Sequence, residues 1–90
     1  MNPSETYILF ELAGSTYGIR SAEVQHLDLL EHITPVPNTA PAVAGVVFSR
    51  GKVVPALDLR VRFGLPPAPA TAKTRLIFVH LPQRVVALIV

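Results

Sequence analysis

Residues 42–66 have the sequence AVAGVVFSRGKVVPALDLRVRFGLP, and this stretch decides the predicted fold. Two apolar runs of strand length flank a polar Arg50-Gly51 pair. Their β-branched and aromatic residues suit a pleated, half-buried surface, and Gly51 can adopt the positive φ that a tight turn needs. The pattern predicts a β-hairpin that turns at Arg50-Gly51 and is followed by a short basic helical segment ending at Gly64.

Length and composition set the class of protein. The chain has 90 residues, of which 50% are hydrophobic, so we expect one small folded domain. It has no cysteine, which excludes disulfides and thiolate metal sites and is compatible with the cytoplasm. No apolar run approaches the roughly 18 to 20 residues of a membrane helix, and the N-terminus lacks the features of a signal peptide. We therefore expect a soluble, cytoplasmic protein without membrane insertion.

The charges are distributed unevenly although the net charge is only +2. Residues 1–45 contain five acidic residues and one basic residue, whereas residues 46–90 contain one acidic residue and seven basic ones. Such asymmetry is typical of proteins with an acidic or nucleic-acid partner. The simpler interpretation is that the two halves neutralise each other across a sheet.

The first half of the chain predicts a second hairpin and an ambiguous segment. Residues 7–12 alternate in polarity, Gly14-Ser15 is a turn signal, and strand character resumes at 17–19. Between Val24 and Ile33 the apolar spacing slightly favours a helix over a strand. Prolines in the loop 35–41 prevent a helix from continuing.

The C-terminal part predicts a further hairpin. Residues 65–72 are rich in proline and small residues, as in a semi-rigid linker, and strands are expected at 74–81 and 84–90. The sequence ends within an apolar run, and an unpaired apolar strand recruits another chain. We therefore expect either absent partner strands or self-association through the 74–90 hairpin. Five or more short strands and one short helix predict a mainly β fold, a small barrel.

The residues give little support for catalysis. The three histidines, His26, His32 and His80, fall on separate predicted elements, and no third ligand completes a metal site. The acidic residues form no clear pair for acid–base chemistry, Ser49 has no nearby base in sequence, and the glycines match no phosphate-binding pattern. We expect no enzyme activity and no catalytic, cofactor or metal site.

Two non-catalytic functions stay open on these grounds. Small β-barrels bind oligonucleotides, and the basic residues of the second half could line a groove: Arg50, Lys52, Arg60, Arg62 and Arg75. Only three phenylalanines, Phe48, Phe63 and Phe78, are available there as stacking platforms. The other function is a protein-interaction module that uses strand edges and apolar grooves. The residues favour the protein-binding adaptor.

Four sequence motifs match the pattern of a known protein family. They are Tyr7-Ile8-Leu9-Phe10 with Tyr17-Gly18-Ile19; Ile33-Thr34-Pro35-Val36-Pro37 with Val43-Ala44-Gly45-Val46; Arg50-Gly51 through Asp58-Leu59-Arg60 to Phe63-Gly64-Leu65-Pro66; and Thr74 to Val79. In this order they resemble the CheW-like coupling domain of bacterial chemotaxis over nearly the whole chain. One departure is local, because Phe48-Ser49 occupies the places of the family's Asn-Leu pair.

The resemblance implies a mainly β fold: a small five-stranded SH3-like β-barrel of the CheW-like type, with one or two short helical turns and an extra C-terminal hairpin. Family domains have two similar barrels, so residues 1–66 would form the first subdomain, 67–73 a Pro/Ala linker and 74–90 the opening hairpin of an incomplete second subdomain. For the ambiguous segment, the family implies a turn at Ser21–Gln25 and a strand over about His26–Thr34.

The same resemblance implies an adaptor that couples chemoreceptors to the histidine kinase CheA, without catalysis or cofactor. Its partners would be the kinase regulatory domain and the receptor cytoplasmic tip, not nucleic acid. Arg50, beside the tight turn, is the expected recognition residue, because a guanidinium presents a planar fork to a carboxylate. The predicted protein-interaction residues are Arg50, Gly51, Val36, Val43, Phe48, Lys52 and Arg62. Asp58 is expected to cap the basic helical turn.

Overall fold

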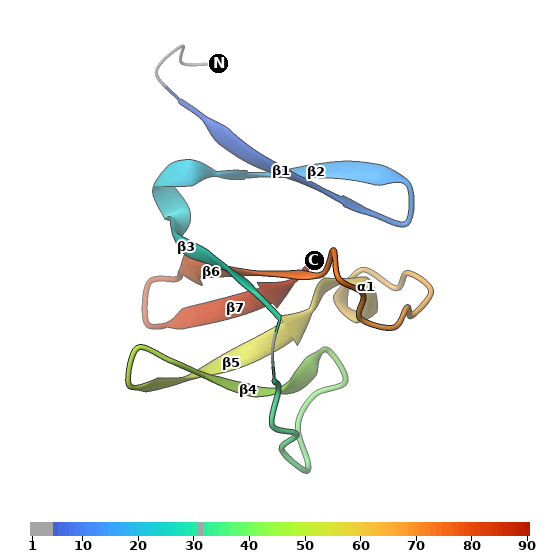
Figure 1. The fold of residues 1–90 in the computed structure, drawn as a ribbon, viewed down its shortest axis with the longest axis vertical. Helices are drawn as coiled ribbons and strands as arrows, with labels where there is room; N and C mark the ends of the chain where they lie inside the picture. The colour runs from blue at the N-terminus through green and yellow to red at the C-terminus, as the bar shows by residue number, and fades with distance from the viewer. Residues whose placement is uncertain (1–4, 31) are drawn as a thin grey trace.

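The computed structural model describes residues 5–30 and 32–90, and strands dominate them (Figure 1). The strands are β1 (Tyr7–Leu12), β2 (Ser15–Arg20), β3 (Val24–Leu29), β4 (Val43–Ser49), β5 (Lys52–Asp58), β6 (Arg75–His80) and β7 (Val85–Ile89). The short helical segments are the 3-10 turn η1 (Ser21–Glu23) and the α-helical turn α1 (Leu59–Arg62). The predicted mainly β class and both hairpins at 7–20 and 43–58 are confirmed.

The strands form two sheets of unequal size. β1 and β2 pair only with each other, whereas the other five strands form one sheet in the order β3-β6-β7-β5-β4. β5 and β7 run parallel, and the remaining neighbours are antiparallel. In Figure 1 the β1–β2 hairpin lies across the top of the five-stranded sheet.

The C-terminal strands lie at the centre of the larger sheet. β6 pairs with β3 on one side and β7 on the other, and β7 also pairs with β5, with Ala56 opposite Ala87. The predicted hairpin over 74–90 is present as the antiparallel pair β6–β7, but it is not an addition to the sheet: these strands are part of the same sheet as β3, β4 and β5. Self-association was expected because an unpaired apolar strand recruits another chain. That reason does not apply to β6 and β7, because each already pairs with a strand on both sides. The continuous apolar run Leu76–Val79 is typical of a central strand buried on both faces.

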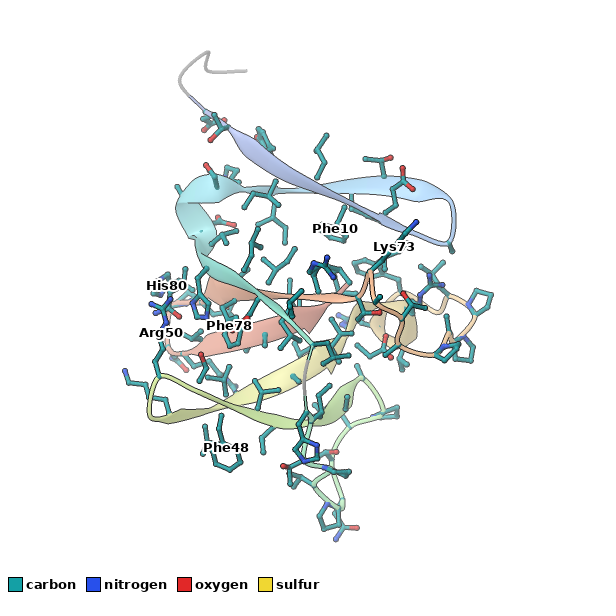
Figure 2. All side chains as sticks on the ribbon, viewed as in Figure 1. Phe10, Phe48, Arg50, Lys73, Phe78 and His80 are labelled. Carbon is teal, nitrogen blue, oxygen red and sulfur yellow. The ribbon has the colours of Figure 1, made fainter. Side chains whose placement is uncertain are left out.

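Each face of the central strands contributes to a separate core. Leu76 and Phe78 of β6 point to one face, where they join Val47, Val54, Ala56 and Ala87. Ile77 and Val79 point to the other face, where they join Val86 and half-buried residues of the hairpin, among them Ile8, Phe10 and Ile19. Figure 2 shows Phe10 between the hairpin and the larger sheet. The hairpin is thus held by one apolar face.

The larger sheet curls so that its two edge strands approach each other. Thr34, which follows β3, forms an isolated bridge with Val46 of β4, through two backbone hydrogen bonds of 2.9 Å. Gly45 permits this approach, because a Cβ at that position would overlap the Thr34 carbonyl. Among the described residues this bridge is the only backbone pairing between the two edges, so they are joined at one point and not by a continuous ladder.

The segment after the first hairpin differs in part from its prediction. The expected turn is present as η1, but β3 begins at Val24 and ends at Leu29, whereas a strand from His26 to Thr34 was expected. The chain leaves β6 after Leu29 and crosses to the opposite edge of the sheet, where Thr34 bridges β4. Glu31, within the predicted strand, lies outside the described residues.

Asp58 ends β5 and begins α1, as the sequence predicts. Its Oδ1 atom accepts hydrogen bonds from the backbone N–H groups of Arg60 at 2.9 Å and Val61 at 3.4 Å. A carboxylate in this position satisfies donors that a helix leaves free at its start. The cap fixes where the chain turns away from the sheet.

Candidate protein-interaction surface

The β4–β5 turn is a two-residue turn with both residues in the left-handed region. Ser49 pairs with Lys52, and φ is 53° at Arg50 and 77° at Gly51. Turns of this kind favour Asn-Gly, because most side chains crowd the following carbonyl at positive φ. Glycine therefore suits position 51, whereas Arg50 is strained. Strain of this kind is concentrated at functional sites, which makes Arg50 a candidate for recognition.

Two apolar side chains stand exposed beside this turn. Phe48 and Val53 are cross-strand partners, and 72% and 58% of their surfaces are exposed. In Figure 2 the Phe48 side chain points away from the sheet. An exposed phenylalanine is unfavourable in water unless another surface covers it, and aromatic residues are enriched at protein interfaces. Phe48 therefore joins Arg50 as a candidate contact.

The same end of the sheet is basic. Arg50 and Lys52 are exposed at the turn, and Arg84, directly before the parallel strand β7, is exposed as well. The only ion pairs among the described residues join Arg20 to Glu5 and Glu23, all from the first half of the chain. The expected neutralisation of one half by the other through ion pairs is therefore not found there.

The remaining predicted contacts lie at the opposite end of β4 and β5. The Thr39 hydroxyl lies within hydrogen-bonding distance of the Val36 and Val43 carbonyls, which brings these two residues together. Arg62 is in α1, directly after β5, and the Asp58 N–H donates to the Ala42 carbonyl beside Val43. The seven predicted residues thus divide into two groups: Phe48, Arg50, Gly51 and Lys52 at the turn, and Val36, Val43 and Arg62 at the other end.

The two groups are too far apart to form one small contact. β5 has seven residues, and a strand rises about 3.4 Å per residue, so its ends are about 20 Å apart. A single side chain cannot cover both. If both predicted groups make contacts, either one extended partner would reach both ends or two partners would contact one end each.

A histidine that the site prediction omitted links the turn to the opposite edge strand. His26 of β3 stacks on Phe78, with ring centroids 4.1 Å apart and planes inclined by 13°. Its Nε2 atom lies 3.4 Å from Ser49 Oγ, next to Arg50, whereas its buried Nδ1 atom has no partner. Burial, followed by repulsion from Arg50, lowers the pKa of His26 below its ordinary value. Sequence spacing could not reveal this contact, because 23 residues separate His26 from Ser49.

The basic residues do not line a nucleic-acid groove. Arg50 and Lys52 lie at the turn, whereas Arg60 and Arg62 lie in α1 at the other end of β5. Phe78 is only 2% exposed and belongs to the core, and Phe63 stacks on Tyr17. Charge and stacking platforms are therefore not interleaved along one surface.

The cavities in the structure are open recesses at the surface. A hollow of about 380 Å³ lies beside the 68–74 loop, with Glu11, Asp58, Arg60 and Lys73 among its lining residues. No His/Cys/Asp/Glu cluster of three suited to a metal occurs in residues 5–30 and 32–90. Within the same residues, no helix has the length and apolarity to span a membrane.

Known proteins share this sequence and arrangement. The family model of the CheW-like domain matches residues 6–90. The chain is 33% identical over 86 residues to "Chemotaxis protein CheW" of Klebsiella aerogenes, covering 96% of this chain and 52% of that protein. It is 36% identical over 75 residues to "Chemotaxis protein CheW" of Bacillus subtilis, covering 83% of this chain and 48% of that protein.

A solved structure has the same fold. The scaffolding protein TtCheW from Thermoanaerobacter tengcongensis superimposes with a TM-score of 0.91 at 30% sequence identity. The match covers 96% of this chain and 59% of TtCheW. The chain therefore spans about half the length of the curated relatives it matches. Motif order, strand arrangement and the family match agree, and the chain belongs to the CheW-like domain family.

Proposed function

We propose that this chain acts as a non-catalytic adaptor that couples chemoreceptors to a CheA-type histidine kinase in the bacterial cytoplasm. The observation that carries the proposal is the family match over residues 6–90, together with the fold shared with TtCheW. Two of the relatives are named chemotaxis proteins, and TtCheW is named a scaffolding protein. The partners themselves are inferred from the family.

The β4–β5 turn is the proposed recognition surface. It combines a strained, exposed Arg50 with the basic Lys52 and the apolar Phe48–Val53 pair. Arginine and aromatic residues that meet a partner together are the usual source of binding energy at protein interfaces. A guanidinium at a turn can donate two parallel N–H hydrogen bonds to the two oxygens of a carboxylate.

The opposite end of β5 is the proposed secondary contact. Val36 and Val43 are half-buried or exposed, and Arg62 is exposed on α1. These residues lie about 20 Å from the turn by the strand rise, so a partner at the turn would not require them. This separation makes Arg62 a suitable control for Arg50.

The test measures binding of the 90-residue chain to a kinase regulatory domain and to a receptor cytoplasmic tip, each by isothermal titration calorimetry. Arg50→Glu is expected to weaken at least one interaction about tenfold or more, as removal of an interface arginine typically does. Arg62→Glu makes the same charge change at the other end and is expected to have a smaller effect on that interaction.

The alternatives give distinct results. If neither partner binds the folded wild-type chain, the adaptor proposal is wrong for this chain. If Arg62→Glu weakens binding and Arg50→Glu does not, the adaptor function stands but the recognition surface lies at the α1 end. Circular dichroism of each variant shows whether the fold is retained.

A further inference from the structure

The side chains of His26, Ser49 and Phe78 form a contact, here called the seam, between two strands that share no ladder. β3 and β4 are the opposite edges of the five-stranded sheet. His26 reaches across from β3 to Ser49 of β4, and its ring rests on Phe78 of β6. Among the described residues, the His26–Ser49 contact and the backbone bridge at Thr34 are the polar links between the two edges.

The hydrogen-bond partners in the seam suit only the neutral form of the His26 ring. A neutral imidazole has one N–H donor and one acceptor, whereas an imidazolium has two donors that both need acceptors. Nε2 faces the Ser49 hydroxyl, but Nδ1 is buried without a partner. Protonation in place would therefore bury an unsatisfied, charged N–H group, which is costly in the interior of a protein.

The surrounding charges work in opposite directions. On β3 itself, Asp28 favours the protonated ring, while Arg50 from the β4–β5 turn opposes it. Two further titratable groups, His32 after β3 and His80 on β6, are exposed to solvent. The largest effect is burial of the ring, which lowers its pKa from the ordinary 6.5.

A recess lies next to the seam. It has a volume of about 160 Å³, and its lining residues include Asp28, Ser49, Leu76 and Phe78. If the His26 ring moves out to water, it uncovers the side of Phe78 on which it now stacks. Separation of the edges would then widen this recess and free Ser49, the residue directly before Arg50.

We propose that the seam is an acid-sensitive latch: protonated His26 leaves Phe78 and Ser49, and β3 separates from β4. The latch goes beyond the adaptor function and does not depend on it, since it belongs to the isolated chain. Opening of the latch would affect the proposed recognition surface at the β4–β5 turn. Ser49, directly before Arg50, would lose its contact with His26 of β3.

The direction with pH follows from proton linkage. The closed form binds a proton on His26 more weakly than the open form, whose ring has an ordinary pKa. Above pH 6.5 both forms are neutral and the closed form is fully favoured. As pH falls below this value the open form takes up the proton first, so opening rises by up to about tenfold per pH unit until the closed form also titrates.

The experiment follows the latch by NMR on the full 90-residue chain between pH 8 and pH 5. The His26 ring resonances report its titration, and amide hydrogen exchange of Thr34 and Val46, whose backbone hydrogen bonds join the two edges, reports opening. Protection factors, corrected for intrinsic exchange, are expected to fall by up to about tenfold per pH unit below 6.5. His26→Phe, which keeps a ring on Phe78 and removes the titration, should abolish this pH dependence, and His80→Gln, which removes an exposed histidine, should retain it.

Three results would overturn the latch. They are a His26 ring whose pKa is at or above its ordinary value, protection of the Thr34 and Val46 amides that does not change with pH, and a pH dependence that persists in His26→Phe. If His26→Phe does not fold, the wild-type titration decides by itself, because the His26 ring and the Ser49 amide must shift with one common midpoint. No partner protein is present, so failure here leaves the adaptor proposal to its own test.

Discussion

β1 (YILFEL) of the hairpin and β6 (RLIFVH) of the five-stranded sheet are both apolar strands of six residues, but they are stabilised differently. In the hairpin, Leu12 is 2% exposed and Leu9, three residues earlier, is 68% exposed, because only one face meets the rest of the protein. In β6, four consecutive residues from Leu76 to Val79 are buried. Both strands have residues that favour β structure. They differ in burial: one face of β1 packs against the protein, whereas both faces of β6 are covered.

Because of this difference, we expect the hairpin to detach more easily than the whole protein unfolds. A two-stranded hairpin is marginal in water and depends on packing against another element. Here that packing comes from Ile8, Phe10 and Ile19 against the second core. The larger sheet has its own additional core around Phe78, which contains no hairpin residue. The hairpin should therefore be lost before the sheet.

The largest expected effect is in the core of the sheet. Phe78→Ala should lower the free energy of unfolding by about 3 to 5 kcal/mol, because it removes a ring that is 2% exposed and leaves a cavity. Phe48→Ala removes the same ring from a position that is 72% exposed and should change stability by less than about 0.5 kcal/mol. Urea unfolding measures both.

A small effect of Phe78→Ala would contradict the placement of β6 at the centre of the sheet. If the alanine variant is too unstable to measure, Phe78→Leu gives a partial loss with the same sign. Because the total stability of a small domain is only about 5 to 15 kcal/mol, even this smaller change is measurable.

The second effect tests the two faces of the hairpin. Leu12→Ala should cost about 2 to 3 kcal/mol, toward the lower end for a buried leucine, because detachment of a two-stranded hairpin limits the loss. Leu9→Ala, on the exposed face, should cost less than about 0.5 kcal/mol. The measurement is thermal unfolding of both variants. Equal losses would mean that the outer face is covered in solution.

The smallest effects concern polar contacts in each region. Asp58→Ala removes the cap of α1 and should cost about 1 kcal/mol, since two backbone N–H groups lose their acceptor. Arg20→Ala breaks the exposed ion pairs near the hairpin and should leave the unfolding midpoint unchanged. A larger loss for Arg20→Ala than for Asp58→Ala would show that the ion pairs, not apolar packing, hold the hairpin.

Local features of the fold were predictable from the sequence, because they depend on neighbouring residues. The Arg50-Gly51 turn and the Asp58 cap are each set by a few adjacent positions. The place of β7 beside β5 was not predictable, since a parallel pairing joins segments that are about 30 residues apart. The end of β3 at Leu29 was not predicted for a related reason: Thr34, within the predicted strand, pairs with Val46 of β4, and this long-range pairing leaves no local signal.

The candidate site shows the same limit. Phe48, Arg50, Gly51 and Lys52 could be grouped in advance because they share one turn. Val36, Val43 and Arg62 were grouped with them on the family pattern, and strand length separates them. His26 was not among the predicted site residues, since its contacts with Phe78 of the neighbouring strand and with Ser49 of the opposite edge strand depend on long-range strand pairing.

The adaptor proposal is tested most directly by asking whether the chain joins two partners at once. Membranes that contain a chemoreceptor are incubated with CheA-type kinase, with and without the 90-residue chain, and sedimented. The proposal predicts that the chain increases the kinase recovered with the membranes, and that Arg50→Glu reduces this increase more than Arg62→Glu does. Kinase that stays in the supernatant, although the folded chain is present in excess, would contradict the coupling function.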